Sequence, residues 1–230
     1  MKIGQKKIFI AFSGVDGAGK TTQVRLLKSV LYSLGCNNIK EVWLRSPHML
    51  AFLVYSFYRK MGYLYMPLKH KLFKHLWLWL EIMSLIPKML EVKIITLLSD
   101  CIIAERYLFD TIVTILVYFV RDLKFIKSIP IRFLLSYIIK KKDKAIFIYL
   151  DISCEEAIKR RLKRLNKDDV HLLNRYLRER TLQLIKVQRI LYNTLIHLVQ
   201  GCKIDTTEKT IKEVFRSLAQ MIISVYARRQ

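Results

Sequence analysis

The chain has 230 residues, of which 53% are hydrophobic, and a formal net charge of +23 at pH 7. This length can bury a sizeable core, and the hydrophobic content argues against a disordered chain. The charge indicates an anionic ligand: a small phosphorylated molecule is favoured, while nucleic acid or an anionic membrane surface stays open as a partner. We expect a single domain over residues 1–230.

The cysteines and the long apolar stretches both favour an intracellular protein. Cys36, Cys101, Cys154 and Cys202 are far apart and form no CxxC pair. Reduced thiols in a cytoplasmic protein are the simplest interpretation for a chain of this size. The two longest apolar stretches are each either interrupted by charges or too short to span a membrane, so we expect buried helices at 72–98 and 107–120.

Short apolar runs alternate with amphipathic segments along the whole chain. The apolar runs predict strands at 6–13, 39–46, 100–105, 144–151 and 202–205. The segments between them predict helices at 20–35, over most of 48–98, up to about 121, at about 130–142, at 154–165, at about 170–198, and after an N-cap at Thr207. Such alternation predicts a three-layer α/β fold, with a five-stranded parallel sheet flanked by helices. Ligands of these folds bind beyond the carboxyl ends of the strands.

A glycine-rich segment follows the first predicted strand. Residues 14–21 read GVDGAGKT and match G-x-x-x-x-G-K-[ST], the phosphate loop of nucleotide-binding proteins. Its glycines allow the backbone N–H groups to turn toward a polyphosphate, Lys20 reaches the β- and γ-phosphates, and the Thr21 hydroxyl ligates Mg²⁺. The expected ATP-binding residues are Gly14, Val15, Asp16, Gly17, Ala18, Gly19, Lys20, Thr21 and Thr22.

Arginines follow several strands at the predicted ligand edge. Arg45 ends the second strand, Arg106 ends the third, and Arg160, Arg161 and Arg164 come after the fourth. Transfer of a phosphoryl group between two anions needs such cations around both phosphates. No predicted strand ends in the Asp-Glu pair of an ATPase motor, so a small-molecule kinase is favoured over a motor.

The order of short motifs resembles that of the thymidylate kinases, a family of P-loop nucleoside monophosphate kinases. The motifs are GVDGAGKTTQ, a strand ending in Arg45 before a proline, ERY at 105–107, D-x-x-x-E-x-A-x-x-R at 151–160, and IDTTEKTIKEV at 204–214. They cover nearly the whole chain. The resemblance implies the P-loop kinase fold, ATP and Mg²⁺, nucleotide substrates, a homodimer, and a lid at about 160–170.

The resemblance also implies roles on the acceptor side of the site. Asp16 would approach the sugar hydroxyl of the acceptor, while Arg45 and Arg106 would hold its monophosphate. Tyr107 and Asp110 complete the expected substrate-binding residues. The alternative for Tyr107 is packing in the core, and the alternative for Asp110 is to cap or pair within its helix.

Roles on the donor side follow from the same resemblance. Glu105 stands for the family's Asp and would help to place Mg²⁺ through water, and Asp205 would lie near the adenine. Gly17 occupies a position where one subtype carries an arginine, so the catalytic arginine should come from the lid. Arg160 and Arg164 are its candidates, whereas Arg161 is expected on a solvated helix face.

Other positions depart from the family. Its thymine-reading arginine is missing, since no arginine lies between Lys71 and Asp100, and Asp110 stands at a serine position. We expect ATP-dependent phosphorylation of dTMP to dTDP. The alternatives are a kinase of the same fold with a different acceptor, and a non-catalytic P-loop protein that binds ATP and a polyanion.

Overall fold

Five strands form one parallel sheet, as the sequence predicts. The computed structural model describes residues 7–44, 49–60, 71–163 and 175–229. The strand order is β2-β3-β1-β4-β5, so the strand that leads into the phosphate loop is central. The strands are β1 (Ile8–Ser13), β2 (Ile39–Trp43), β3 (Cys101–Arg106), β4 (Ala145–Asp151) and β5 (Cys202–Asp205).

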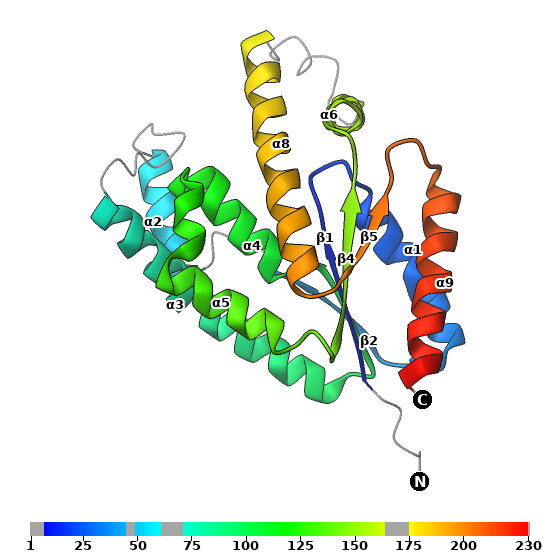
Figure 1. Ribbon diagram of the computed structural model, residues 1–230. Helices are drawn as coiled ribbons and strands as arrows, with labels where there is room; N and C mark the ends of the chain where they lie inside the picture. The colour runs from blue at the N-terminus through cyan, green and yellow to red at the C-terminus, as the bar shows by residue number, and fades with distance from the viewer. Residues whose placement is uncertain (1–6, 45–48, 61–70, 164–174, 230) are drawn as a thin grey trace.

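Helices cover both faces of the sheet and give three layers (Figure 1). One layer is formed by α1 (Lys20–Ser33) and α9 (Ile211–Arg229), which pack against each other. The other contains α3 (Lys71–Leu98), α4 (Leu108–Thr114), α5 (Ile129–Ile139) and α8 (Arg175–Leu198). The remaining helices are α2 (Met49–Lys60), which packs on α3, and α6 (Cys154–Leu162), which follows β4 at the carboxyl edge.

Burial along the strands explains their order in the sheet. Every residue of β1 and β4 is buried, whereas β2 and β5 alternate between buried and exposed positions. Continuous apolar runs therefore mark the strands that are covered on both faces, and shorter mixed runs mark the edges. This burial leaves the carboxyl end of β1, and the loop that follows it, in the middle of the ligand edge.

The two predicted buried helices are present, and each has one feature that the sequence did not predict. Beyond Thr114, α4 continues as a π-helical turn to Val120, so the predicted buried helix up to about 121 is confirmed. The predicted helix at 72–98 is also present as α3 and runs through Pro87, but one of its faces is exposed. No described helix is both long and apolar enough to cross a membrane.

The prediction that all cysteines are reduced is wrong for one pair. Cys36, which follows α1, and Cys101, the first residue of β3, form a disulfide with their Cα atoms 6.0 Å apart. Cys154 and Cys202 are free. The two bonded cysteines are 65 residues apart in the sequence, and the pairing of β2 with β3 and the packing of α1 beside β3 bring them together.

Candidate active site

The glycine-rich loop adopts a backbone that two of its glycines make possible. Gly14 has φ 148°, and a Cβ there would lie 2.5 Å from the carbonyl oxygen of Leu150. Gly17 has φ 102°, and a Cβ there would lie 2.9 Å from the carbonyl oxygen of Ala157. An arginine at position 17 would therefore be strained and would collide with α6. Val15 and Ala18, which directly follow these two glycines, have buried side chains, so these residues offer a ligand only their backbone.

Lys20 begins α1 and lies folded back over the loop. Its Nζ donates to the carbonyl oxygens of Gly14 at 2.7 Å and Val15 at 2.9 Å, and only 5% of the residue is exposed. Burial, followed by the nearby charge of Arg106, lowers the pKa of Lys20 to about 8. A phosphate in the loop would offer this ammonium a better acceptor than the two carbonyl groups.

Thr21 and Glu105 meet at the mouth of the loop. The Thr21 hydroxyl donates to Glu105 Oε1 at 2.5 Å, which joins α1 to the end of β3. A hydroxyl and a carboxylate oxygen are hard ligands of the kind that Mg²⁺ takes together with phosphate oxygens and water. The two predicted metal-binding residues therefore lie together and fit the ion. Thr22, one residue further along α1, is half-buried.

Arg106 lies between two carboxylates. One of its Nη atoms contacts Asp16 Oδ1 in the loop, and the other lies 3.6 Å from Asp110 Oδ1. Both carboxylates raise the pKa of Arg106, against the opposing effect of burial. The structure thus brings together four of the predicted residues, Lys20, Asp16, Arg106 and Glu105, from the loop and from the end of the adjacent strand.

Tyr107 and Asp110 point into the protein interior rather than into the site. Tyr107 is 2% exposed, and its ring packs edge-on against Phe9 at 5.1 Å between centroids. Asp110 is fully buried in the first turn of α4. In this conformation Tyr107 takes the core-packing alternative. Asp110 takes the capping alternative, because its carboxylate accepts from the backbone N–H of Tyr107 at 3.3 Å.

Adjacent arginines of α6 point in different directions. Arg160 donates to Glu156 Oε1 at 3.0 Å and to the carbonyl oxygens of Thr206 at 2.8 Å and Thr207 at 3.2 Å. Arg161 is exposed, as expected for a solvated face, and it also lines the cavity of the loop. The sequence signal that could have identified it is helical spacing: Arg161 lies four residues beyond Ala157, which touches Gly17. Arg45 and Arg164 lie outside the described residues.

The cavity above the loop collects the charged groups of the site. Its volume is about 300 Å³, and it lies at the carboxyl ends of β1 and β3. Its wall contains Asp16, Gly17, Gly19, Lys20, Thr21, Glu105, Arg106 and Arg161. Asp205 does not line this cavity. Its carboxylate accepts two hydrogen bonds from Thr207, and these lower the pKa of Asp205. Because the Thr207 hydroxyl is bonded to Asp205, it does not cap α9, and the predicted N-cap at Thr207 is wrong. Thr210 occupies that place, because its Oγ1 accepts from the backbone N–H of Glu213.

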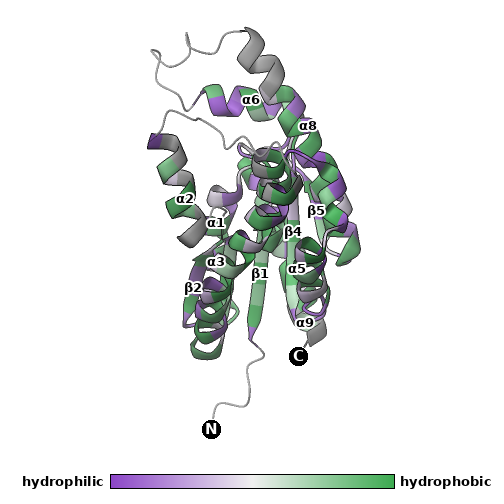
Figure 2. Cartoon of the chain, turned by 90° about the vertical axis from the view of Figure 1, so that its left-hand side faces the viewer, coloured by the Kyte–Doolittle hydropathy of each residue, from purple (hydrophilic) through white to green (hydrophobic). Residues whose placement is uncertain are grey.

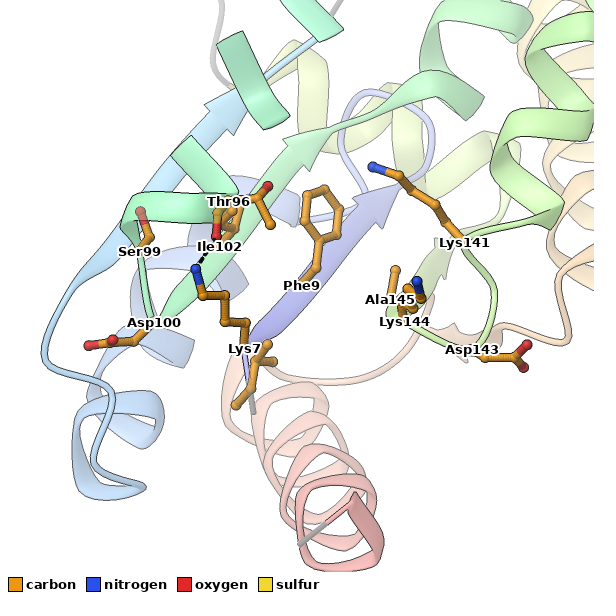
Figure 3. A pocket seen from close by; sticks show the side chains of 11 residues that line it. Lys7, Phe9, Thr96, Ser99, Asp100, Ile102, Lys141, Asp143, Lys144 and Ala145 are labelled. Atoms are coloured by element: carbon orange, nitrogen blue, oxygen red, sulfur yellow. Dashed lines mark hydrogen bonds between the residues drawn. The ribbon is translucent and has the colours of Figure 1, made fainter. Parts of the chain in front are cut away.

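A larger cavity of about 510 Å³ lies at the opposite end of the sheet (Figure 3). It is lined by residues at the starts of β1, β3 and β4, with Phe9 in its wall. Several of its polar groups already have partners: Lys7 donates to the Thr96 and Leu97 carbonyl oxygens, and Lys141 lies over the rings of Phe9 and Tyr137. None of the predicted site residues lines it, so the smaller cavity is the candidate active site.

Comparison with solved structures shows the same fold. No family model matches the sequence, and none of the curated proteins matches it. A thymidylate kinase from Candida albicans is 17% identical, with a TM-score of 0.63 over 95% of this chain and 92% of its own. A thymidylate kinase from Ehrlichia chaffeensis is 18% identical, with a TM-score of 0.52 over 94% of this chain and 98% of its own. At these identities the likeness shows the fold of the thymidylate kinases.

Proposed function

We propose that the chain is an ATP-dependent nucleoside monophosphate kinase, with dTMP as the expected acceptor. One observation carries this proposal: Lys20, Arg106 and Arg161 converge on a single cavity from the loop, from the end of β3 and from α6. The fold shared with thymidylate kinases supports the same reaction class. A loop that only binds ATP has no need for further arginines directed at the γ-phosphate and at a second anion.

Different residues of the cavity bind the phosphate donor and the phosphate acceptor. The loop amides and Lys20 hold the triphosphate of ATP, and Arg106 holds the acceptor phosphate beside Asp16. An acceptor phosphate oxygen forms a bond to the γ-phosphorus while the bond from that phosphorus to the β-phosphate oxygen breaks, which leaves ADP. Arg161 neutralises the charge on the γ-phosphoryl group as it passes between the two oxygens.

Thr21 and Glu105 would hold Mg²⁺ together with phosphate oxygens. When bound, the ion supplies charge neutralisation on the β- and γ-phosphates. The direct contact between Thr21 and Glu105 supports this role, because it holds the two oxygen-bearing side chains together.

A different acceptor on the same fold is the second candidate. The observation that favours it is the absence of arginine from residues 71–100, which include all of α3. The published description of the Candida albicans enzyme names broad substrate specificity for that protein. We therefore keep other nucleoside monophosphates as candidate acceptors.

An acceptor panel tests both candidates. ADP release is measured with ATP, Mg²⁺ and each of dTMP, dUMP, dCMP, dAMP, dGMP and the matching ribonucleotides. Turnover with dTMP well above all others supports the first candidate, and turnover with another acceptor replaces it by the second. If no acceptor raises ADP release above that of the Lys20→Ala variant, the proposal of a nucleotide kinase is overturned.

We further infer that the protein forms a homodimer through the outer face of α3. Eight apolar residues on this helix are between 39% and 68% exposed, and they recur every three or four residues: Leu72, Leu76, Trp79, Met83, Ile86, Leu90, Ile94 and Leu97. In Figure 2, much of the ribbon of α3 has the colour of hydrophobic residues. So narrow a stripe is typical of a helix that pairs with another helix.

Sedimentation equilibrium tests the homodimer. Met83→Glu and Leu90→Glu should shift the protein from dimer to monomer, because each would bury a charge at the centre of the pair. Ile223→Glu on α9 is the matched control, since Ile223 is 47% exposed on the opposite layer. A wild-type monomer at all concentrations would exclude this interface.

A further inference from the structure

A buried hydrogen-bonded cluster surrounds the carboxylate of Asp110. Its Oδ2 accepts from the Ser13 hydroxyl at 2.8 Å and from the backbone N–H of Tyr107 at 3.3 Å. Its Oδ1 accepts from the Tyr192 hydroxyl at 2.9 Å and lies 3.6 Å from Arg106. The side chain of Asp110 has no exposed surface. A carboxylate this deeply buried is costly unless its partners are well placed, so the cluster holds a defined geometry.

The partners of Asp110 come from elements that are distant in the sequence. Ser13 is the last residue of β1 and directly precedes Gly14 of the phosphate loop. Arg106 is the last residue of β3, and Tyr192 belongs to α8. Asp110 therefore connects the entry of the loop, the acceptor-side arginine and the long helix.

Arg106 is held from one exposed side and one buried side. The carboxylate of Asp16 is 39% exposed, whereas that of Asp110 is inaccessible to solvent. An incoming phosphate can compete with Asp16 for the guanidinium, but it cannot reach Asp110. Asp110 thus stays behind Arg106 during binding and fixes the direction in which the guanidinium presents its N–H groups.

Helix α8 is bonded at two points one turn apart, to the end of β4 and to the start of α4. Arg189 donates to both carboxylate oxygens of Asp151, at 2.8 and 2.9 Å, at the end of β4. Three residues later, Tyr192 donates to Asp110. The ring of Tyr192 also stacks on that of Tyr149 at 5.4 Å between centroids. The position of α8 is therefore set from both sides of the central strand β1.

We propose that Asp110 is a positioning residue that orients Arg106 toward the phosphate loop and, through Tyr192, fixes α8 relative to that arginine. The inference rests on the proposed function, because it assigns Arg106 to the acceptor phosphate. It predicts that damage to the cluster impairs the acceptor side of the site more than the ATP side.

Steady-state kinetics provide the first test. Asp110→Asn keeps the shape and removes the charge, and it should raise the acceptor KM about tenfold while the Kd for ATP changes less than about twofold. Tyr192→Phe should raise the acceptor KM about threefold. Tyr149→Phe is the matched control, because it removes a buried tyrosine hydroxyl from Asp151, a carboxylate that pairs with Arg189 and Lys203, and it should leave the acceptor KM unchanged.

Side-chain NMR of Arg106 provides a test that does not depend on turnover. Its Nε–H signal, assigned with Arg106→Lys, should exchange slowly with water in the wild-type protein and faster in Asp110→Asn. If the wild-type protein phosphorylates no acceptor, the proposed function fails and this measurement still decides the role of Asp110.

Three outcomes would overturn the inference. The first is an unchanged acceptor KM together with an unchanged Arg106 signal in Asp110→Asn. The second is an equal loss of ATP and acceptor binding, which would indicate a merely structural role. If Asp110→Asn does not fold, Tyr192→Phe and Ser13→Ala take its place. The third outcome is then that both variants keep the acceptor KM and the Arg106 signal of the wild type.

Discussion

The carboxyl edge of the sheet and the outer face of α3 are built in opposite ways. At the carboxyl edge, polar side chains are buried and bonded to one another: Lys20 to loop carbonyl groups, Asp110 to Ser13 and Tyr192. On α3, apolar side chains such as Leu90 are exposed to solvent. The first region is complete within one chain, whereas the second has an apolar surface that a partner would cover. Changes at the edge should therefore alter chemistry, and changes on α3 should alter association.

Replacement of Lys20 should give the largest effect on chemistry. Lys20→Ala removes the cation closest to the β- and γ-phosphates, and we expect turnover to fall about a thousandfold, or about 4 kcal/mol of transition-state stabilisation. The measurement is ADP release under saturating ATP and acceptor. The sedimentation behaviour of the variant should equal that of the wild type, because Lys20 lies away from α3. Turnover within tenfold of the wild type would remove the loop from the mechanism.

Reduction of the disulfide should give the largest effect on stability. The bond between Cys36 and Cys101 closes a loop across 65 residues of sequence, for which chain entropy predicts about 4 kcal/mol of stabilisation. We expect Cys36→Ser, or treatment with a phosphine reductant, to lower the free energy of unfolding by up to about that amount. Chemical denaturation with and without reductant measures it. Cys202→Ser is the control, because Cys202 is free.

Replacing each of the two adjacent arginines of α6 should change kcat to a different extent. Arg161 lines the cavity, so Arg161→Ala should lower kcat about a hundredfold, or about 2.7 kcal/mol. Arg160 is bonded to Glu156 and to the backbone after β5, so Arg160→Ala should lower kcat less and should raise the KM for ATP instead. Equal effects of the two substitutions on kcat would contradict the assignment of Arg161.

Local patterns explain which parts of the molecule the sequence predicts. The parallel sheet follows from short apolar runs, and the loop from glycines whose φ values only a few residues adopt, so both depend on neighbours in the chain. The meeting of Thr21 with Glu105 follows from the rule that parallel strands share one ligand edge. In these cases, one motif or one rule of topology contains the information.

Contacts between distant segments explain the rest. The disulfide joins residues 36 and 101, and the burial of Asp110 depends on Tyr192, which is 82 residues further along the chain. The direction of Arg161 depends on how α6 lies on the loop, since a change of one residue turns a helical side chain by about 100°. No spacing in the sequence reports these packing relations, so Arg161 was missed and Tyr107 was expected to contact substrate.

The pH dependence of ATP binding gives the smallest and most specific effect at the carboxyl edge. In the free protein the pKa of Lys20 is lowered to about 8, mainly by burial, and phosphate favours the charged form. Below pH 8, Lys20 is already charged and its contribution to the Kd for ATP is constant. Above pH 8 the lysine is neutral and ATP binding must take up a proton, so the Kd should rise by up to about tenfold, or about 1.4 kcal/mol, per pH unit.

The same lowered pKa has the opposite effect on stability. Between about pH 8 and 10.5, the unfolded chain binds more protons at Lys20 than the folded chain, so the folded state gains stability from this group as the pH rises. Subtracting the stability of Lys20→Met from that of the wild type at each pH isolates this contribution from those of other titrating groups. The difference should favour the wild type increasingly from pH 8 to 9.5, while ATP affinity falls over the same range. If neither the stability difference nor the Kd for ATP changes in this interval, Lys20 is solvated. The carboxyl edge would then resemble the exposed face of α3 in its contact with water.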